Sequence, residues 1–166
     1  MRRTRRSWLA LVLLVATAIG GTACAATARV SGPGGKRVRV QYTRLGTTLR
    51  TDRRNTVTVA AYRSLVGGTR HEQPLHGMHF EAADVRMCAR TSGGVVGPSM
   101  VTLRTTNNHH VLASASTPIG PPLRSQQLAR GRCTLGWVAF DVPSATTGAH
   151  VVVFDGNDDS MRWSVH

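Results

Sequence analysis

The sequence is poor in acidic residues, in aromatic residues and in lysine. Its 166 residues include eight Asp or Glu and 5% aromatic residues, and Lys36 stands against twenty arginines. With so few rings, a hydrophobic core has to be built mainly from Val, Leu and Ala. The formal net charge of +13 comes almost wholly from arginine.

The short motifs of common enzyme classes are also absent. The sequence has no Gly-x-Ser-x-Gly elbow, HExxH, P-loop or dinucleotide-binding glycine pattern. We therefore predict a protein that is not an enzyme and uses no cofactor. Nucleic acid is not an expected partner, because no aromatic residues alternate with the arginines to stack bases.

Residues 1–23 have the pattern of an export signal. Four arginines precede Trp8, an apolar run covers residues 9–19, and small residues lead into Cys24. A basic segment, a short apolar segment and a small-residue cleavage region form a secretory signal peptide. The apolar run is shorter than the roughly 20 residues that span a bilayer. The general secretory route and the twin-arginine route both stay open.

Two cleavage routes are open at Cys24. Thr22-Ala23-Cys24 resembles a bacterial lipobox, in which Cys24 carries the lipid (palmitate among its acyl chains) and becomes the N-terminus, although Gly21 stands where that motif usually has Leu. Ordinary cleavage after Ala25 would instead give a secreted protein. Acylation leaves two cysteines to pair, so we expect a lipoprotein tethered to the outer face of the cell membrane.

The segment after the signal is basic. Residues 24–46 are rich in small residues, Gly and Pro, and we expect a flexible tether there. Residues 24–70 carry ten Lys or Arg against one Asp, whereas residues 71–166 carry seven of each sign. Such a segment could contact anionic lipid head groups or wall polymers, or it could be a solvated linker followed by the first strands.

Residues 47–166 have an all-β pattern. Short runs rich in Val, Thr and aromatic residues alternate with Gly, Pro, Asn and Asp, and no window shows a convincing amphipathic helix. Strands are expected at 56–62, 79–89, 100–104, 110–115, 135–142, 149–154 and 161–165, with a long connection over 117–132. Seven to eight strands predict an immunoglobulin-like antiparallel β-sandwich, and a flattened barrel is the nearest alternative.

Cys88 and Cys133 are predicted to form a disulfide. They lie 45 residues apart in a small exported domain, where such a crosslink is common. Two cysteines without a CxxC spacing would make a poor zinc site.

The late part of the chain resembles a known family. Gly131-x-Cys133-x-x-Gly136-Trp137-Val138-Ala139-Phe140-Asp141-Val142-Pro143, followed by a Val-rich strand and Trp163-x-Val165, is similar to the small bacterial exported domains that share an immunoglobulin-like sandwich with a secreted mycobacterial immunoprotective antigen. The resemblance covers about residues 47–166. It implies a sandwich behind a signal and a tether, and it supplies no catalytic residues.

Two segments have residues that could bind a metal ion. His71, His76 and His79, near Met78, could bind copper or zinc, or they could be exposed histidines of a polar loop. The turn at 155–159 has carboxylates suited to calcium, but such clusters usually only form turns. Trp137, Phe140 and Trp163 are expected in the core.

Together these features predict a non-catalytic, lipid-anchored binding or interaction module at the cell envelope. Its partner would be an envelope protein or a wall polymer. The alternative is an extracytoplasmic copper- or zinc-binding protein that uses the three histidines.

Overall fold

The computed structural model describes residues 25–31, 37–51, 55–69, 72–91, 94–154 and 160–166. The signal at 1–23, Cys24, His71 and the turn at 155–159 lie outside these ranges. Twelve strands are present in the described chain, together with one 3₁₀ turn, η2 (Pro98–Met100). No helix in these ranges has the length and apolar character needed to cross a membrane.

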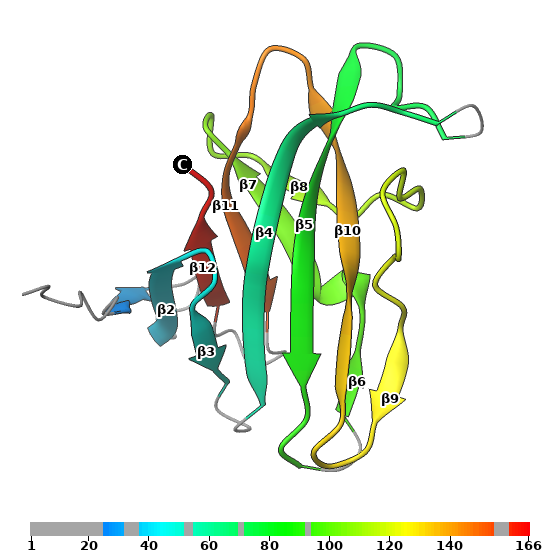
Figure 1. The fold of residues 1–166 in the computed structure, drawn as a ribbon. Helices are drawn as coiled ribbons and strands as arrows, with labels where there is room; N and C mark the ends of the chain where they lie inside the picture. The colour runs from blue at the N-terminus through cyan, green and yellow to red at the C-terminus, as the bar shows by residue number, and fades with distance from the viewer. Residues whose placement is uncertain (1–24, 32–36, 52–54, 70–71, 92–93, 155–159) are drawn as a thin grey trace, which may run out of the picture.

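The strands form two large sheets packed face to face, with a two-stranded ribbon beside them (Figure 1). Sheet A has six strands in the order β1 (Ala26–Ser31), β2 (Arg37–Arg44), β12 (Ser160–Ser164), β11 (Gly148–Phe154), β7 (Val101–Thr105) and β8 (His110–Leu112). Sheet B has four strands in the order β10 (Cys133–Pro143), β5 (Met78–Cys88), β4 (Thr56–Val66) and β3 (Thr48–Arg50). The ribbon pairs β6 (Gly94–Val96) with β9 (Gln126–Leu128). The predicted all-β sandwich is thereby confirmed.

The pairing is antiparallel except between β12 and β2, which run parallel. In this pair Arg162 lies opposite Tyr42, although 120 residues separate them in the chain. β2 therefore joins the sheet through a strand from the far end of the sequence.

The boundary expected at residue 47 is wrong. Residues 24–46 contain β1 and β2, and β2 is an integral strand of sheet A. The alternation Val38-Arg39-Val40-Gln41-Tyr42 gives β2 the period of a strand. Its pairing with β12 supplies backbone hydrogen bonds that could not be predicted from the neighbouring Gly- and Pro-rich sequence.

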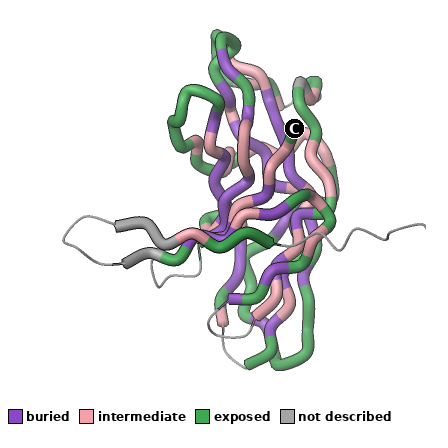
Figure 2. The backbone as a smooth tube through the Cα atoms, turned by 90° about the vertical axis from the view of Figure 1, so that its left-hand side faces the viewer, coloured by how far each residue is buried: buried purple, intermediate pink, exposed green. Residues whose placement is uncertain are grey.

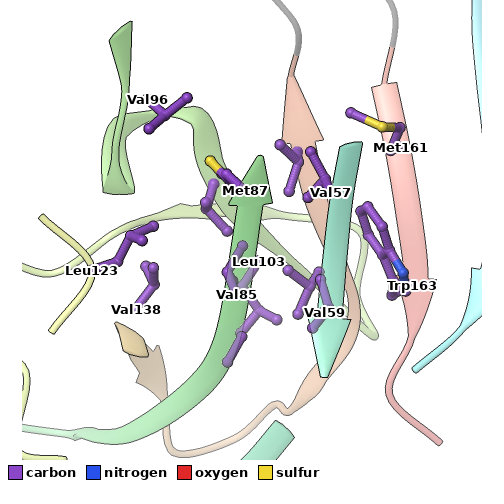
Figure 3. Packing of buried hydrophobic residues seen from close by; sticks show 14 of the residues in the cluster. Val57, Val59, Val85, Met87, Val96, Leu103, Leu123, Val138, Met161 and Trp163 are labelled. Atoms are coloured by element: carbon purple, nitrogen blue, oxygen red, sulfur yellow. The ribbon is translucent and has the colours of Figure 1, made fainter. Parts of the chain in front are cut away.

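The core lies between the sheets, and β10 shows the alternation that supplies it. In β10, residues 134, 136, 138, 140 and 142 are all buried, whereas most of the intervening residues are exposed or half-buried. Buried and more exposed stretches of backbone follow each other along the chain (Figure 2). Val57, Val59, Val85 and Met87 of sheet B face Leu103, Met161 and Trp163 of sheet A (Figure 3). Valine dominates this layer, as expected from the scarcity of aromatic residues.

The free edge of β10 is covered by chain from the long connection. Trp137 donates its backbone N–H to Pro121 O (2.8 Å), and Leu123 donates its own to Trp137 O (2.8 Å). Gly136 permits this approach, because a Cβ there would lie 2.5 Å from Leu123 N. The covered edge cannot serve as a template for another strand.

Candidate functional site

Cys88 and Cys133 form the predicted disulfide. They lie directly opposite each other in the pairing of β5 with β10, on the outer face of sheet B. Arg86 Nη2 lies 3.7 Å from Cys133 Sγ. An open pocket of about 380 Å³ beside the disulfide is lined by Thr48, Thr56, Thr58, Arg86, Cys88, Ala89, Arg90, Gly131 and Cys133.

The histidines of the proposed metal site do not assemble. Of the two that are described, His76 is exposed, whereas His79 Nε2 lies 3.0 Å from Glu81 Oε1. Within the described ranges no group of three or more His, Cys, Asp or Glu side chains is arranged to hold a metal ion. His71 and the possible calcium turn at 155–159 lie outside those ranges.

The three predicted core aromatics have different positions. Phe140 and Trp163 are fully buried between the sheets, and Trp163 Nε1 donates to Thr47 O at 2.8 Å. Trp137 is only half-buried and lies on the outer face of sheet B, with the Arg63 guanidinium carbon 5.4 Å from its ring centroid. The prediction that Trp137 lies in the core is wrong. Trp137 and Phe140 are three residues apart on β10, so their side chains point to opposite faces of the sheet.

A buried carboxylate closes one end of the interior. Glu81 is inaccessible to solvent and accepts hydrogen bonds from Tyr62 Oη and from the backbone N–H of Gly148 (2.8 Å). His79 pairs with its other oxygen. Burial, followed by the hydrogen bond and the charge of Glu81, raises the pKa of Tyr62 well above its usual range. These partners account for both carboxylate oxygens, so we interpret the group as structural.

The outer face of sheet A is a different surface. Residues directly opposite each other in paired strands share a face, and the registers define two rows of outward side chains across five strands. The first row is Tyr42, Arg162, Val152, Thr102 and Leu112. The second row is Arg44, Ser164, His150, Arg104 and His110. We call the basic members, Arg44, Arg104, His110, His150 and Arg162, together with Tyr42, the arginine–histidine face.

Charge is segregated between the two sheets. The six strands of sheet A contain six arginines and no Asp or Glu, whereas the four strands of sheet B contain three arginines and three acidic residues. The arginines of sheet A are Arg29, Arg37, Arg39, Arg44, Arg104 and Arg162. Three aspartates occur in the turn between β11 and β12, outside the described ranges.

The basic groups of this face influence one another. Burial lowers the pKa of His150, and the positive charges of Arg104, Arg162 and His166 lower it further. The pKa of His110 falls for the same reasons, with burial first, then Arg104 and Arg162. Both directions are those expected for imidazoles that are partly buried beside other positive charges.

Within the described ranges, the face also contains buried polar atoms without a hydrogen-bond partner. They are Thr102 Oγ1, His150 Nδ1, Ser160 Oγ and Arg162 Nε. Thr102 and Ser160 are 6% and 2% exposed, although both point away from the core. Buried polar groups in folded proteins are normally paired, so four unpaired atoms on one face mark it as unusual.

Sequence reasoning missed this face entirely. Tyr42 lay inside the expected tether, and His150 and Arg162 belonged to strands predicted from their Val and aromatic content. Their common side emerges only from the registers of β2, β12, β11 and β7. Within single strands, the alternation in Met161-Arg162-Trp163 was the available signal that Arg162 faces away from the core.

Comparison with known proteins supports the architecture. A scan against protein-family models finds no match, and a search of curated proteins finds no matching relative. Among solved structures, the chain is similar in fold to the secreted protein MPT63 of Mycobacterium tuberculosis, with a TM-score of 0.58 and 16% identity. The match covers 74% of this chain and 95% of that one. At this identity the likeness concerns the fold.

Proposed function

We propose that this protein is an exported, lipid-anchored and non-catalytic domain that binds an anionic component of the cell envelope. The segregation of charge between the two sheets carries this proposal, because one sheet is wholly basic in its strands and the other is balanced. A basic surface on a rigid scaffold attracts anionic partners with an affinity that falls as salt rises.

Further support comes from the export pattern at 1–23 and from the sandwich shared with a secreted protein. Acylation at Cys24 would hold the domain near head groups and wall polymers, since each buried methylene adds ~0.8 kcal/mol of membrane affinity. The buried Glu81 and the disulfide are engaged within the fold, so neither is assigned a reaction.

Retention on isolated envelope material tests the proposal. We expect the mature domain without its lipid to bind this material at low ionic strength and to be released by salt. The double variant Arg104→Gln/Arg162→Gln should lose most of the retention, whereas the charge-matched control Arg130→Gln/Arg132→Gln should keep it. Equal retention of the two variants, or none for the unmodified domain, would refute a binding role for sheet A.

A further inference from the structure

Arg162 on β12 is held by two contacts with Tyr42 on β2. Its Nη1 donates to Tyr42 Oη at 3.1 Å, and its guanidinium carbon lies 5.4 Å from the centroid of the Tyr42 ring. These two contacts fix the plane of the guanidinium. Its Nε is buried and has no hydrogen-bond partner among the residues that the structure describes.

Other polar groups that could donate hydrogen bonds to a bound ligand lie on the same face as this arginine. Tyr42 Oη receives the Arg162 bond and keeps its own hydrogen for donation. The Tyr42 ring meets His150 edge-on, with centroids 6.0 Å apart, and His150 Nδ1 is buried without a partner. The hydroxyls of Thr102 and Ser160 are unpaired as well.

The strand registers place these groups on the same face of four neighbouring strands, with the buried Val152 between Arg162 and Thr102. Val152 lies opposite Arg162 on one side and opposite Thr102 on the other. Directly opposite side chains in a sheet have Cβ atoms about 4.5–5.5 Å apart. His150 is two residues from Val152 on the same face of β11. Tyr42 on β2, Arg162 on β12 and His150 on β11 therefore lie on adjoining strands, whereas Thr102 on β7 is two strand spacings from Arg162.

We propose that the arginine–histidine face contains a binding site for a phosphate group, centred on Arg162 between Tyr42 and His150. Arg162 Nε and Tyr42 Oη donate to the phosphate oxygens, and the Ser160 hydroxyl lies two residues from Arg162 on the same face of β12. A tetrahedral oxyanion has more acceptor positions than a carboxylate and suits donors that come from several strands. The site rests on the proposed function, for which it names the ligand chemistry.

A bound oxyanion would also change the protonation of His150. An anion beside the imidazole favours its charged form, so binding draws a proton to His150 and grows stronger as pH falls. Sulfate is the suitable probe, because it stays a dianion over the range in which phosphate itself titrates. The groups that face His150 are Tyr42 and Arg44 on β2, Ser164 and Arg162 on β12, Arg104 on β7, His110 on β8, and His166.

Titration of the mature domain with inorganic phosphate and with sulfate, followed by NMR of the arginine Nε–H and histidine signals, tests the site. We expect saturable shifts at Arg162 and His150 with a Kd on the order of 1 mM or tighter. Arg162→Gln and His150→Gln should each weaken sulfate binding at least tenfold, and Arg130→Gln should change it less than twofold. Arg162→Lys keeps the charge but loses Nε–H, and it should also bind at least fivefold more weakly.

The source of the phosphate is settled by two further ligands. Phosphatidylglycerol vesicles and a soluble glycerol-phosphate polymer are compared with phosphatidylcholine vesicles, and the ligand that competes with sulfate at Arg162 is the biological class. Sulfate binding without envelope retention would uphold the site and refute the proposed function. Shifts that chloride reproduces at equal ionic strength, or equal affinities for Arg162→Gln and Arg130→Gln, would overturn the site.

Discussion

The backbone N–H of Gly148 donates to the carboxylate of Glu81 at 2.8 Å and so joins β11 of sheet A to β5 of sheet B. The contact requires glycine, because a Cβ at this position would lie 2.7 Å from Glu81 Oε2 and 2.9 Å from Leu103 Cδ1. Neither neighbour can yield easily, since both Glu81 and Leu103 are fully buried. This end of the sandwich is held by a polar contact across the interior.

Gly148→Ala should therefore destabilise the domain by about 1–3 kcal/mol, the usual cost of overpacking a filled interior. Urea unfolding followed by tryptophan fluorescence measures the change. Gly67→Ala is the matched control, because its Cβ would meet no atom within 4 Å. Similar stabilities for the two variants would contradict the packing described around Glu81.

Tyr62→Phe should cost roughly 1.5–3 kcal/mol at neutral pH, the value of a hydrogen bond to a charged acceptor. It should also flatten the alkaline side of the stability curve. Burial and Glu81 raise the pKa of Tyr62 on folding, so above about pH 10 the native state holds a proton that the unfolded chain has lost. Stability then falls with rising pH, and the fall should be smaller without the phenol. Equilibrium unfolding between pH 8 and pH 11 checks both effects, and an unchanged alkaline slope would count against the buried phenol.

The stability of the native domain should fall as pH drops from 7 towards 5. Burial and the nearby arginines lower the pKa of both His110 and His150 on folding. In that interval the unfolded chain binds more protons than the native state, so the free energy of unfolding increases with pH. His150→Gln should reduce this slope, and the exposed, non-titrating control Arg130→Gln should leave it unchanged. Thermal unfolding over the same pH interval in a sulfate-free buffer measures these slopes. Identical slopes for the wild type and His150→Gln would contradict the environment assigned to His150.

Loss of the disulfide should destabilise the fold without removing it. Cys88 and Cys133 close a loop with a sequence separation of 45 residues, which corresponds to roughly 4 kcal/mol in the chain-entropy description. The two strands remain paired along their length, so Cys88→Ala/Cys133→Ala should keep a native β-sheet circular dichroism spectrum with a lower Tm. Unfolding of the oxidised and reduced wild type provides the comparison, and equal midpoints would show that the crosslink adds nothing.

The sequence predicted the strands with clear alternation to within a few residues. Residues 79–89 correspond to β5 (Met78–Cys88), and residues 135–142 lie inside β10 (Cys133–Pro143). The pairing of β5 with β4 contains a register shift between Val59 and Ala61, opposite Val85 and Asp84. Local periodicity is sufficient for such strands, because each has one face in the core.

Short strands escaped prediction for a physical reason. β9 (Gln126–Leu128) lies within the Pro/Gly connection expected over 117–132, and it exists because β6 pairs with it. β2 was hidden by its arginines and by the glycines before it. Such strands depend on partners far away in the chain rather than on their own composition.

The candidate site was less accessible to sequence reasoning than the fold. Tyr42 and Arg162 form a hydrogen bond across 120 residues, and no local pattern encodes which distant strand becomes a neighbour. The burial of Glu81, an acidic residue in an apolar strand, likewise depends on Tyr62 and Gly148. The three histidines looked like a cluster because they are close in sequence, but His79 bonds to Glu81 while His76 remains exposed.

The parallel pairing of β2 with β12 has a consequence for how the chain reaches its final form. β2 is among the first strands to be synthesised, yet its inner neighbour is Ser160–Ser164. In a chain that ends before residue 160, β12 is missing. One edge of β2 and one edge of β11 then have unpaired backbone N–H and C=O groups. Truncated molecules that end before residue 160 should thus be prone to self-association and sensitive to proteases, because a single short strand completes the sheet.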